Sequence, residues 1–163
     1  MEQQKYRILF VCLGNICRSP AAQAVMQRIV DEHGASGRFE LDSAGIGNWH
    51  AGQLPDPRMR AHARRRGLEL THRARQVRES DFDRFDLIIG MDSGNLADLR
   101  ELAPTPEALA KIKPMAAWIR TMATRYDHVP DPYYEGAEGF ELVLDLLDDA
   151  CSALYADLTR ITS

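Results

Sequence analysis

A short apolar run that leads through a polar loop into an amphipathic segment constrains the fold of this chain more than any other feature. Residues 6–11 carry no helical stripe and predict a buried parallel strand. After the loop at 12–19, apolar residues recur at helical spacing up to Gly34, which predicts a helix with Ser19 as its N-cap and Pro20 at its first position. The order of strand, loop and helix is typical of the first half of a βαβ unit.

The rest of the chain repeats this alternation. Further strands are predicted at 39–44 and 87–91, and one at 110–115 whose Pro114 favours an edge position. Helices are predicted from Asp56-Pro57 to Gly67 and after a cap at Asp92 or Ser93, the latter with Leu96, Leu99 and Leu102 on its inner face. A terminal helix is predicted from its apolar stripe, which comprises Phe140, Val143, Leu144, Leu147, Cys151, Leu154, Leu158 and Ile161. Alternating strands and helices predict an α/β fold with right-handed crossovers and helices on both faces of a parallel sheet.

Length and composition restrict the classes of protein that fit. The 163 residues suit a single domain over 1–163, and 45% hydrophobic with 27% charged residues is typical of a soluble protein. The net charge of −4 argues against general nucleic-acid binding. No apolar run reaches the roughly 20 residues of a membrane span, and the N-terminus lacks the apolar region of a signal peptide. We therefore expect a cytoplasmic protein without a membrane partner, although secretion without a signal peptide stays open.

The loop between the first strand and helix has the residue types of an anion site with a nucleophile. Cys12 and Arg18 stand at its two ends, and the helix dipole and unpaired N–H groups there stabilise a thiolate and a bound phosphate. The planar guanidinium of Arg18 suits two phosphate oxygens. Gly14 allows a close approach of the backbone, and Asn15 tolerates a left-handed conformation. The pattern predicts phosphoryl transfer to Cys12.

The sequence of this loop resembles that of a known family. Cys12-Leu13-Gly14-Asn15-Ile16-Cys17-Arg18-Ser19-Pro20 is similar to the signature loop of the low-molecular-weight protein tyrosine phosphatases. The resemblance covers nearly the whole chain, because residues 42–45 (Asp-Ser-Ala-Gly), Trp49, His72 and residues 131–134 (Asp-Pro-Tyr-Tyr) also come where that family has them. It implies a three-layer sandwich whose four-stranded parallel sheet has the order 2-1-3-4, and hydrolysis of protein phosphotyrosine through a phosphocysteine intermediate without a cofactor.

The resemblance also implies roles for individual residues. Asp131, which by itself reads as a turn residue, becomes the general acid and then the base. Ser19 donates a hydrogen bond to the Cys12 thiolate, while Asn15, Ser43 and His72 brace the loop. The walls and floor of the substrate slot are Leu13, Ile16, Trp49, Tyr133 and Tyr134. The expected partners are phosphotyrosine proteins, a tyrosine kinase among them, with inorganic phosphate as the product. The resemblance also suggests phosphorylation of Tyr133 or Tyr134 by a partner kinase, which the sequence leaves open.

The two remaining cysteines have different expected roles. Cys17 is either a small loop residue that faces the core or, as the resemblance implies, the partner of Cys12 in a reversible protective disulfide. Cys151 lies on the apolar stripe of the last helix and is predicted to be a core residue. No metal is expected, since two nearby cysteines do not complete a zinc site and the histidines other than His72 lack the spacing of metal ligands.

Charge is unevenly distributed along the chain. Residues 58–78 contain eight arginines and one acidic residue, whereas eight acidic residues and one basic residue follow from 131 onward. The arginine-rich stretch is more simply a solvated helix face than a docking surface for acidic phosphoproteins.

Three other functions stay open. A phosphoarginine phosphatase of the same fold carries a small polar residue where this chain has Ile16, and an arsenate reductase needs further cysteines, none of which lies between Cys17 and Cys151. A silent phosphate-binding module is expected to lack Cys12, Arg18 or Asp131. The absence of Gly-x4-Gly-Lys-Ser/Thr excludes a nucleotide-binding P-loop of that type.

Overall fold

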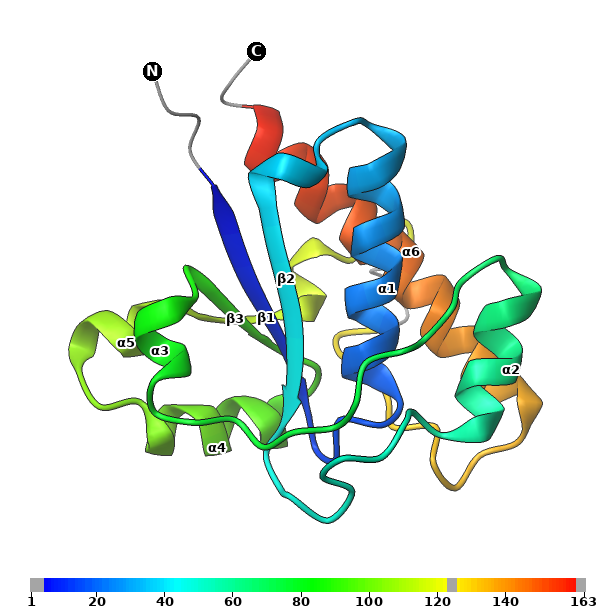
Figure 1. Cartoon of the computed structure of the whole chain (residues 1–163), viewed down its shortest axis with the longest axis horizontal. Coiled ribbons are helices and arrows are strands. Elements are labelled where there is room, and N and C mark those ends of the chain that lie inside the picture. Colours follow the sequence, from blue (N-terminus) through cyan, green and yellow to red (C-terminus); the bar gives the residue numbers. More distant parts are fainter. Residues whose placement is uncertain (1–4, 123–125, 161–163) are drawn as a thin grey trace.

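The computed structural model, which describes residues 5–122 and 126–160, contains a four-stranded parallel sheet (Figure 1). The strands are β1 (Tyr6–Cys12), β2 (Phe39–Gly45), β3 (Leu87–Gly90) and β4 (Ile112–Pro114), in the order β2-β1-β3-β4. This confirms the predicted order 2-1-3-4 and the edge position of the strand that contains Pro114.

Helices cover both faces of the sheet, which confirms the three-layer α/β fold. In Figure 1, α1 and α6 cross one face with α2 beside them, and α3, α4 and α5 lie toward the other side. The helical elements are α1 (Arg18–Glu32), η1 (Ser36–Arg38), α2 (Pro57–Arg65), α3 (Asp81–Arg84), α4 (Ser93–Leu102), α5 (Pro106–Ala110), η2 (Met115–Trp118) and α6 (Ala137–Thr159). The short helices α3 and α5 were not predicted from the sequence, because they are shorter than the window over which helical periodicity can be recognised.

Alternation along β1 divides the core into two layers. Ile8 and Phe10 face the cluster that contains α1 and α6, whereas Leu9 and Val11 face the cluster that contains α3, α4 and α5. Successive side chains of a strand point to opposite faces, so a strand covered on both sides must be apolar throughout. All four side chains are fully buried, and β1 thus becomes the rigid central strand from which the Cys12 loop emerges.

Two helices begin at the caps predicted from the sequence, whereas a third, which bears on the site, does not. Asp56 caps α2 by accepting from the N–H of Arg58, and Asp92 caps α4 by accepting from the N–H of Asn95. The prediction that Ser19 caps α1 is wrong: α1 begins at Arg18, and no side chain caps it. The Ser19 hydroxyl lies against the Cys12 sulfur and the Asn15 amide instead.

One of the two predicted helix stripes needs correction. Leu102 is 46% exposed, while Leu96 and Leu99 pack in the core, so the inner stripe of α4 is shorter than predicted. The terminal helix α6 begins at Ala137, ahead of Phe140. The stripe from Phe140 to Leu154 is buried and Leu158 is partly buried, whereas Ile161 lies outside the described residues.

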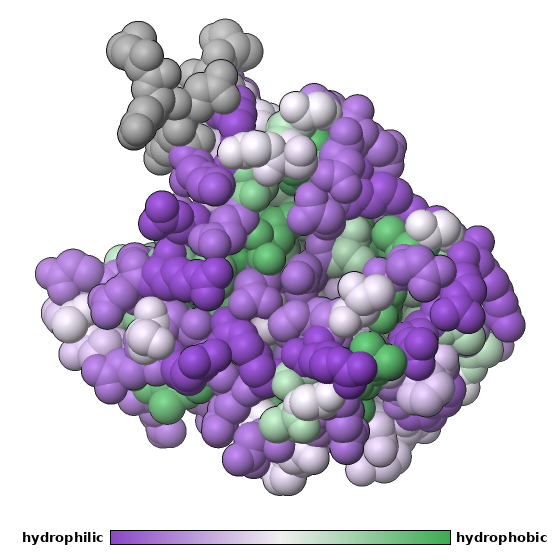
Figure 2. Space-filling view, viewed as in Figure 1, coloured by the Kyte–Doolittle hydropathy of each residue, from purple (hydrophilic) through white to green (hydrophobic). Residues whose placement is uncertain are grey.

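The arginine-rich stretch is a solvated helix face only in part. Arg66 pairs with Glu141, Asp145 and Asp148 of α6, and Arg75 pairs with Asp42 and Asp81. The side chains of Arg66 and Arg75 are each about one fifth exposed. Hydrophilic residues cover most of the molecular face that Figure 2 shows. The uneven charge of the sequence therefore serves partly to join α2 to the acidic helix α6. None of the helices among the described residues is both long and apolar enough to cross a membrane.

Candidate active site

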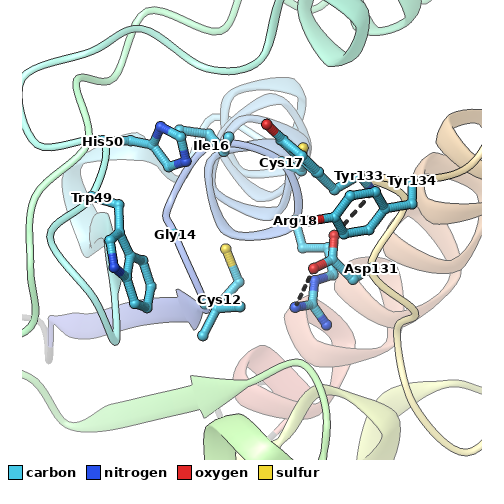
Figure 3. Close-up of a pocket in the computed structure, with 11 residues that line it drawn as sticks. Cys12, Gly14, Ile16, Cys17, Arg18, Trp49, His50, Asp131, Tyr133 and Tyr134 are labelled. Carbon is cyan, nitrogen blue, oxygen red and sulfur yellow. Dashed lines mark hydrogen bonds and ion pairs between the residues drawn. The ribbon is translucent and has the colours of Figure 1, made fainter.

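A pocket of about 220 Å³ opens where β1 ends and α1 begins (Figure 3). Its walls come from the 12–18 loop, from the loop after β2 and from the segment that precedes α6. The residues that line it are Cys12, Leu13, Gly14, Ile16, Cys17, Arg18, Trp49, His50, Asp131, Tyr133 and Tyr134. Ligands of parallel α/β sheets bind at this carboxyl edge of the strands, and the sequence placed all of these residues in the site except His50.

The backbone of the 12–18 loop is held from behind by neighbouring segments. The carbonyls of Cys12, Leu13 and Ile16 accept hydrogen bonds from the N–H groups of residues 46, 47 and 56. These contacts direct the carbonyls away from the pocket, as an anion site requires. Asn15 has φ 59°, the left-handed conformation predicted for it. Gly45 lies directly beneath the loop, because a Cβ there would come within 3.0 Å of three backbone atoms of residues 13–15.

The side chain of Asn15 is the centre of a buried hydrogen-bonded group. Its Nδ2 donates to Ser19 Oγ at 2.7 Å and to Ser43 Oγ at 3.0 Å. Its Oδ1 lies 3.0 Å from His72 Nε2 and accepts from the backbone N–H of Arg75 at 3.1 Å. Burial lowers the pKa of His72 even though the Asp42 carboxylate opposes this effect, so the ring that faces Asn15 is neutral near pH 7. The structure thus brings together the residues that the sequence predicted as a bracing group.

The two cysteines of the loop lie in different environments. Cys12 Sγ is 3.0 Å from Ser19 Oγ and faces the pocket at the start of α1. Burial raises the pKa of Cys17, with the neighbouring Asp56 carboxylate adding to the effect. Both thiols are free and buried in this structure. Of the two thiols, Cys12 is therefore the one that lies beside a hydroxyl donor, whereas burial disfavours the thiolate of Cys17.

Arg18 is a buried cation with its own counterion. Its side chain is 2% exposed, and its Nη1 donates to Asp92 Oδ2 at 2.7 Å and to the carbonyl of Val129 at 2.9 Å. Burial of Asp92 opposes ionisation, but the hydrogen bonds from Arg18 and from the N–H of Asn95, together with the nearby positive charge of Arg18, outweigh it and lower the pKa of this carboxyl. The sequence identified Asp92 only as a helix cap, and its pairing with Arg18 could not be read locally because 74 residues separate the two.

Asp131 stands at the mouth of the pocket opposite the loop. Its Oδ2 lies 3.7 Å from Arg18 Nη2, and its Oδ1 accepts from the backbone N–H of Tyr133 at 3.1 Å. The side chain is 41% exposed, so it can exchange protons with water. Figure 3 shows its carboxyl group directed toward Arg18.

Aromatic side chains flank the pocket on two sides. Trp49 is 65% exposed, which is inconsistent with core packing, and its ring lies against Gly47, where a Cβ would come within 2.0 Å of it. On the other side, Tyr133 is 37% and Tyr134 93% exposed. Flat apolar walls around an anion site fit an aryl phosphate better than an alkyl phosphate.

Arg58 supports one of these walls and was not identified from the sequence. Its guanidinium lies 5.2 Å from the ring centroid of Tyr133 and 4.9 Å from that of Phe140. Two hydrogen bonds to Asp56, of 3.0 and 2.8 Å, fix its plane. A cation held over an aromatic face restrains the ring, so Arg58 orients Tyr133 toward the pocket.

Comparison with known proteins agrees with this geometry. The family model described as low molecular weight phosphotyrosine protein phosphatase matches residues 7–163. The chain belongs to this family. It is 44% identical over 151 residues to a low molecular weight protein-tyrosine-phosphatase of Streptomyces coelicolor, a match that covers 93% of this chain and 92% of that protein.

Solved structures show the same likeness. A protein tyrosine phosphatase from Entamoeba histolytica with Hepes in the active site is 41% identical, with a TM-score of 0.92 over 98% of this chain and 100% of that chain. A Drosophila arginine phosphatase is 31% identical, with a TM-score of 0.84 over 96% of this chain and 98% of that chain. The fold is therefore shared by phosphatases whose names give different substrates.

No group of three or more His, Cys, Asp or Glu side chains that could hold a metal ion lies within residues 5–122 and 126–160.

Proposed function

We propose that this protein hydrolyses protein phosphotyrosine through a phosphocysteine intermediate on Cys12. The observation that carries the proposal is the arrangement of Cys12, Arg18 and Asp131 around one pocket with aromatic walls. Family membership supports phosphotyrosine as the substrate class. We propose that residues 1–163 form one domain and act in the cytoplasm on phosphotyrosine proteins, with no cofactor.

The first step transfers the phosphoryl group to sulfur. The Cys12 thiolate attacks phosphorus, the bond from phosphorus to the tyrosine oxygen breaks, and Asp131 gives its proton to the leaving phenolate. Arg18 and the N–H groups of the loop bind the equatorial phosphate oxygens, whose charge is present in the ground state and the transition state. The Ser19 hydroxyl stabilises the thiolate before attack and as it is released again.

The second step regenerates the enzyme. A water molecule attacks the phosphocysteine, Asp131 takes up one of its protons, and the bond from phosphorus to sulfur breaks. Inorganic phosphate leaves, and Cys12 is a thiolate again. The exposure of Asp131 lets it serve as an acid in the first step and as a base in the second.

A side-by-side assay on phosphotyrosine, phosphoserine and phosphoarginine peptides tests the substrate class. Ile16 and the aromatic walls line the pocket, so we expect phosphotyrosine to be preferred. A preference for phosphoarginine would overturn this interpretation. Arsenate reduction is disfavoured, because no cysteine lies between Cys17 and Cys151.

Two variants test the roles of the residues. Cys12→Ser should abolish turnover of aryl phosphates while retaining phosphate binding, and turnover near wild type would exclude Cys12 as the nucleophile. Asp131→Ala should slow substrates with poor leaving groups by about 10²–10⁴-fold and activated aryl phosphates far less. Equal losses across the series would exclude Asp131 as the acid.

We also propose that Cys17 protects Cys12 by forming a reversible disulfide under oxidation. Both thiols belong to one loop, and the raised pKa of Cys17 keeps its sulfur protonated and out of the phosphoryl transfer. After peroxide treatment, dithiothreitol should restore the activity of the wild type but not of Cys17→Ser, since a lone sulfenic acid is oxidised further.

A further inference from the structure

Gln23 of α1 lies on the far side of the Asn15 group from Cys12. Its Oε1 is 2.7 Å from Ser43 Oγ, and the side chain is half-buried. It lines a second pocket of about 350 Å³ with His72 and Gln27. Neither the sequence pattern of the loop nor the contents of the active-site pocket assign Gln23 a role.

Backbone groups fix the orientation of both amide side chains. The N–H of Arg75 can only donate, so the atom of Asn15 that faces it is Oδ1, and Nδ2 faces the two serines. In the same way, the carbonyl of Leu41 can only accept, which directs Nε2 of Gln23 toward it at 3.5 Å and Oε1 toward Ser43. The orientations therefore follow from groups whose roles as donor or acceptor are not in doubt.

These orientations determine the direction of each hydrogen bond from Gln23 to Cys12. Asn15 uses both protons of its amide on Ser19 and Ser43. The Ser43 hydroxyl accepts from Asn15, so its own proton goes to Gln23 Oε1.

The same reasoning gives the direction of the hydrogen bonds of the Ser19 hydroxyl, on the Cys12 side of the Asn15 group. It also accepts from Asn15, so its proton is available to Cys12 Sγ at 3.0 Å, with the carbonyl of Ala44 a longer alternative at 3.4 Å. The Ser43 proton thus has Gln23 Oε1 as its acceptor, and the nearer of the two acceptors of the Ser19 proton is Cys12 Sγ.

We propose that Gln23 is a positioning residue that, through Ser43 and Asn15, keeps the Ser19 proton directed at the Cys12 sulfur. The proposal rests on Cys12 being the nucleophile of the proposed phosphatase. Without an acceptor at position 23, the Ser43 hydroxyl turns its proton elsewhere and no longer presents a fixed lone pair to Asn15. Asn15 is held in a left-handed conformation and is fully buried, so a loss of one of its partners loosens the loop and weakens the hydrogen bond to the thiolate.

Three variants separate the acceptor from the bulk of the side chain. Gln23→Met keeps the length and removes the acceptor, whereas Gln23→Glu keeps the acceptor. Gln27→Met is the matched control, because Gln27 lies one turn further along α1, lines the same pocket and donates to the exposed Asp31 rather than to the Asn15 group. Should Gln23→Met unfold, Gln23→Lys places a donor where the acceptor was and makes the same test.

The first readout is the rate at which iodoacetate alkylates Cys12 as a function of pH, followed by mass spectrometry of the peptide that contains it. In Gln23→Met, the midpoint of this profile should move to higher pH, and kcat/KM on the acid limb should fall about three- to tenfold, the size expected for one lost hydrogen bond. Gln23→Glu and Gln27→Met should retain the wild-type midpoint. An unchanged midpoint in Gln23→Met, or an equal change in Gln27→Met, would overturn the proposal.

The second readout is a double-mutant cycle with Ser43→Ala. If Gln23 acts through Ser43, then Gln23→Met should have no further effect in the Ser43→Ala background. Additive effects would mean that Gln23 serves only the packing of α1. Alkylation does not depend on any substrate, so a failure of the phosphotyrosine assay and a failure of this inference give different results.

Discussion

The pairing of Arg18 with Asp92 allows a sharp test, since Asp92→Asn removes one charge and little else. Asparagine is a good N-cap residue, so the start of α4 is preserved. Arg18, however, stays 2% exposed and loses the carboxylate 2.7 Å away. Removing one partner of a fully buried ion pair costs about 3–5 kcal/mol. Asp92 is 29% exposed, and the new amide still accepts a hydrogen bond, so we expect the free energy of unfolding to fall by about 2 kcal/mol.

The assay is thermal and urea unfolding at pH 7 with and without inorganic phosphate. For a chain of this length, the expected loss corresponds to a fall in Tm of about 4–8 °C. Asp98→Asn, on the same helix, is the control and should leave Tm near that of the wild type. Saturating phosphate supplies Arg18 with another anion and should narrow the gap between wild type and Asp92→Asn.

The pH dependence of the stability difference provides the result that would refute the pairing of Asp92 with Arg18. The folded state lowers the pKa of Asp92 below its usual 3.8, so the stabilisation is fully present above that value and is lost as the pH falls through the lower folded value. The difference in stability between wild type and Asp92→Asn should therefore have its full size at pH 6–7. It should begin to shrink below about pH 3.8 and disappear below the lower pKa of the folded state. A gap that is absent at pH 7, or that has the same size at every pH, would refute the assignment of Asp92 as the counterion of Arg18.

Two further variants test the walls of the pocket. Gly47→Ala places a Cβ where the Trp49 ring lies and should raise KM for aryl phosphates, with a smaller effect on KM for alkyl phosphates. Equal effects on both classes of substrate would show that Trp49 does not contact the aryl group. Arg58→Met removes the cation 5.2 Å from Tyr133 and should raise KM for aryl phosphates about two- to fivefold without changing kcat, the size expected for an exposed cation–π contact. Steady-state kinetics on phenyl and alkyl phosphates measure both, and a fall in kcat alone for Arg58→Met would argue against a positioning role.

The elements that were predicted from the sequence are those set by short-range rules. The apolar run of β1 predicts a buried strand, and the carboxylates of Asp56 and Asp92 cap the helices that follow them, because caps act within three residues. Ser19 breaks the same rule, since two polar atoms brought by the fold of the loop compete for its hydroxyl. The sequence signal for a cap was present, but tertiary contacts outweighed it.

The parts of the site that escaped prediction depend on residues far apart in the chain. Arg58 acts on Tyr133 across 75 positions, and Gln23 acts on Ser43 across 20. Each is an ordinary surface residue of a helix when read locally. His50 likewise has no distinguishing signal in the sequence, and only the fold places it against the pocket. A family resemblance identifies residues that match a motif, whereas supporting residues outside the motif need the packed structure.

Arg18 connects the two halves of the proposed chemistry. Its Nη1 holds the carbonyl of Val129, two residues before Asp131, and its Nη2 faces the Asp131 carboxyl itself. The group proposed to bind phosphate therefore also helps to position the segment that carries the proposed acid. A lysine at this position could not do both, because a single ammonium lacks the planar fork that reaches two directions at once. In the proposed mechanism, phosphate binding and proton delivery thus depend on one buried side chain, which would account for a guanidinium at the start of a helix whose dipole opposes it.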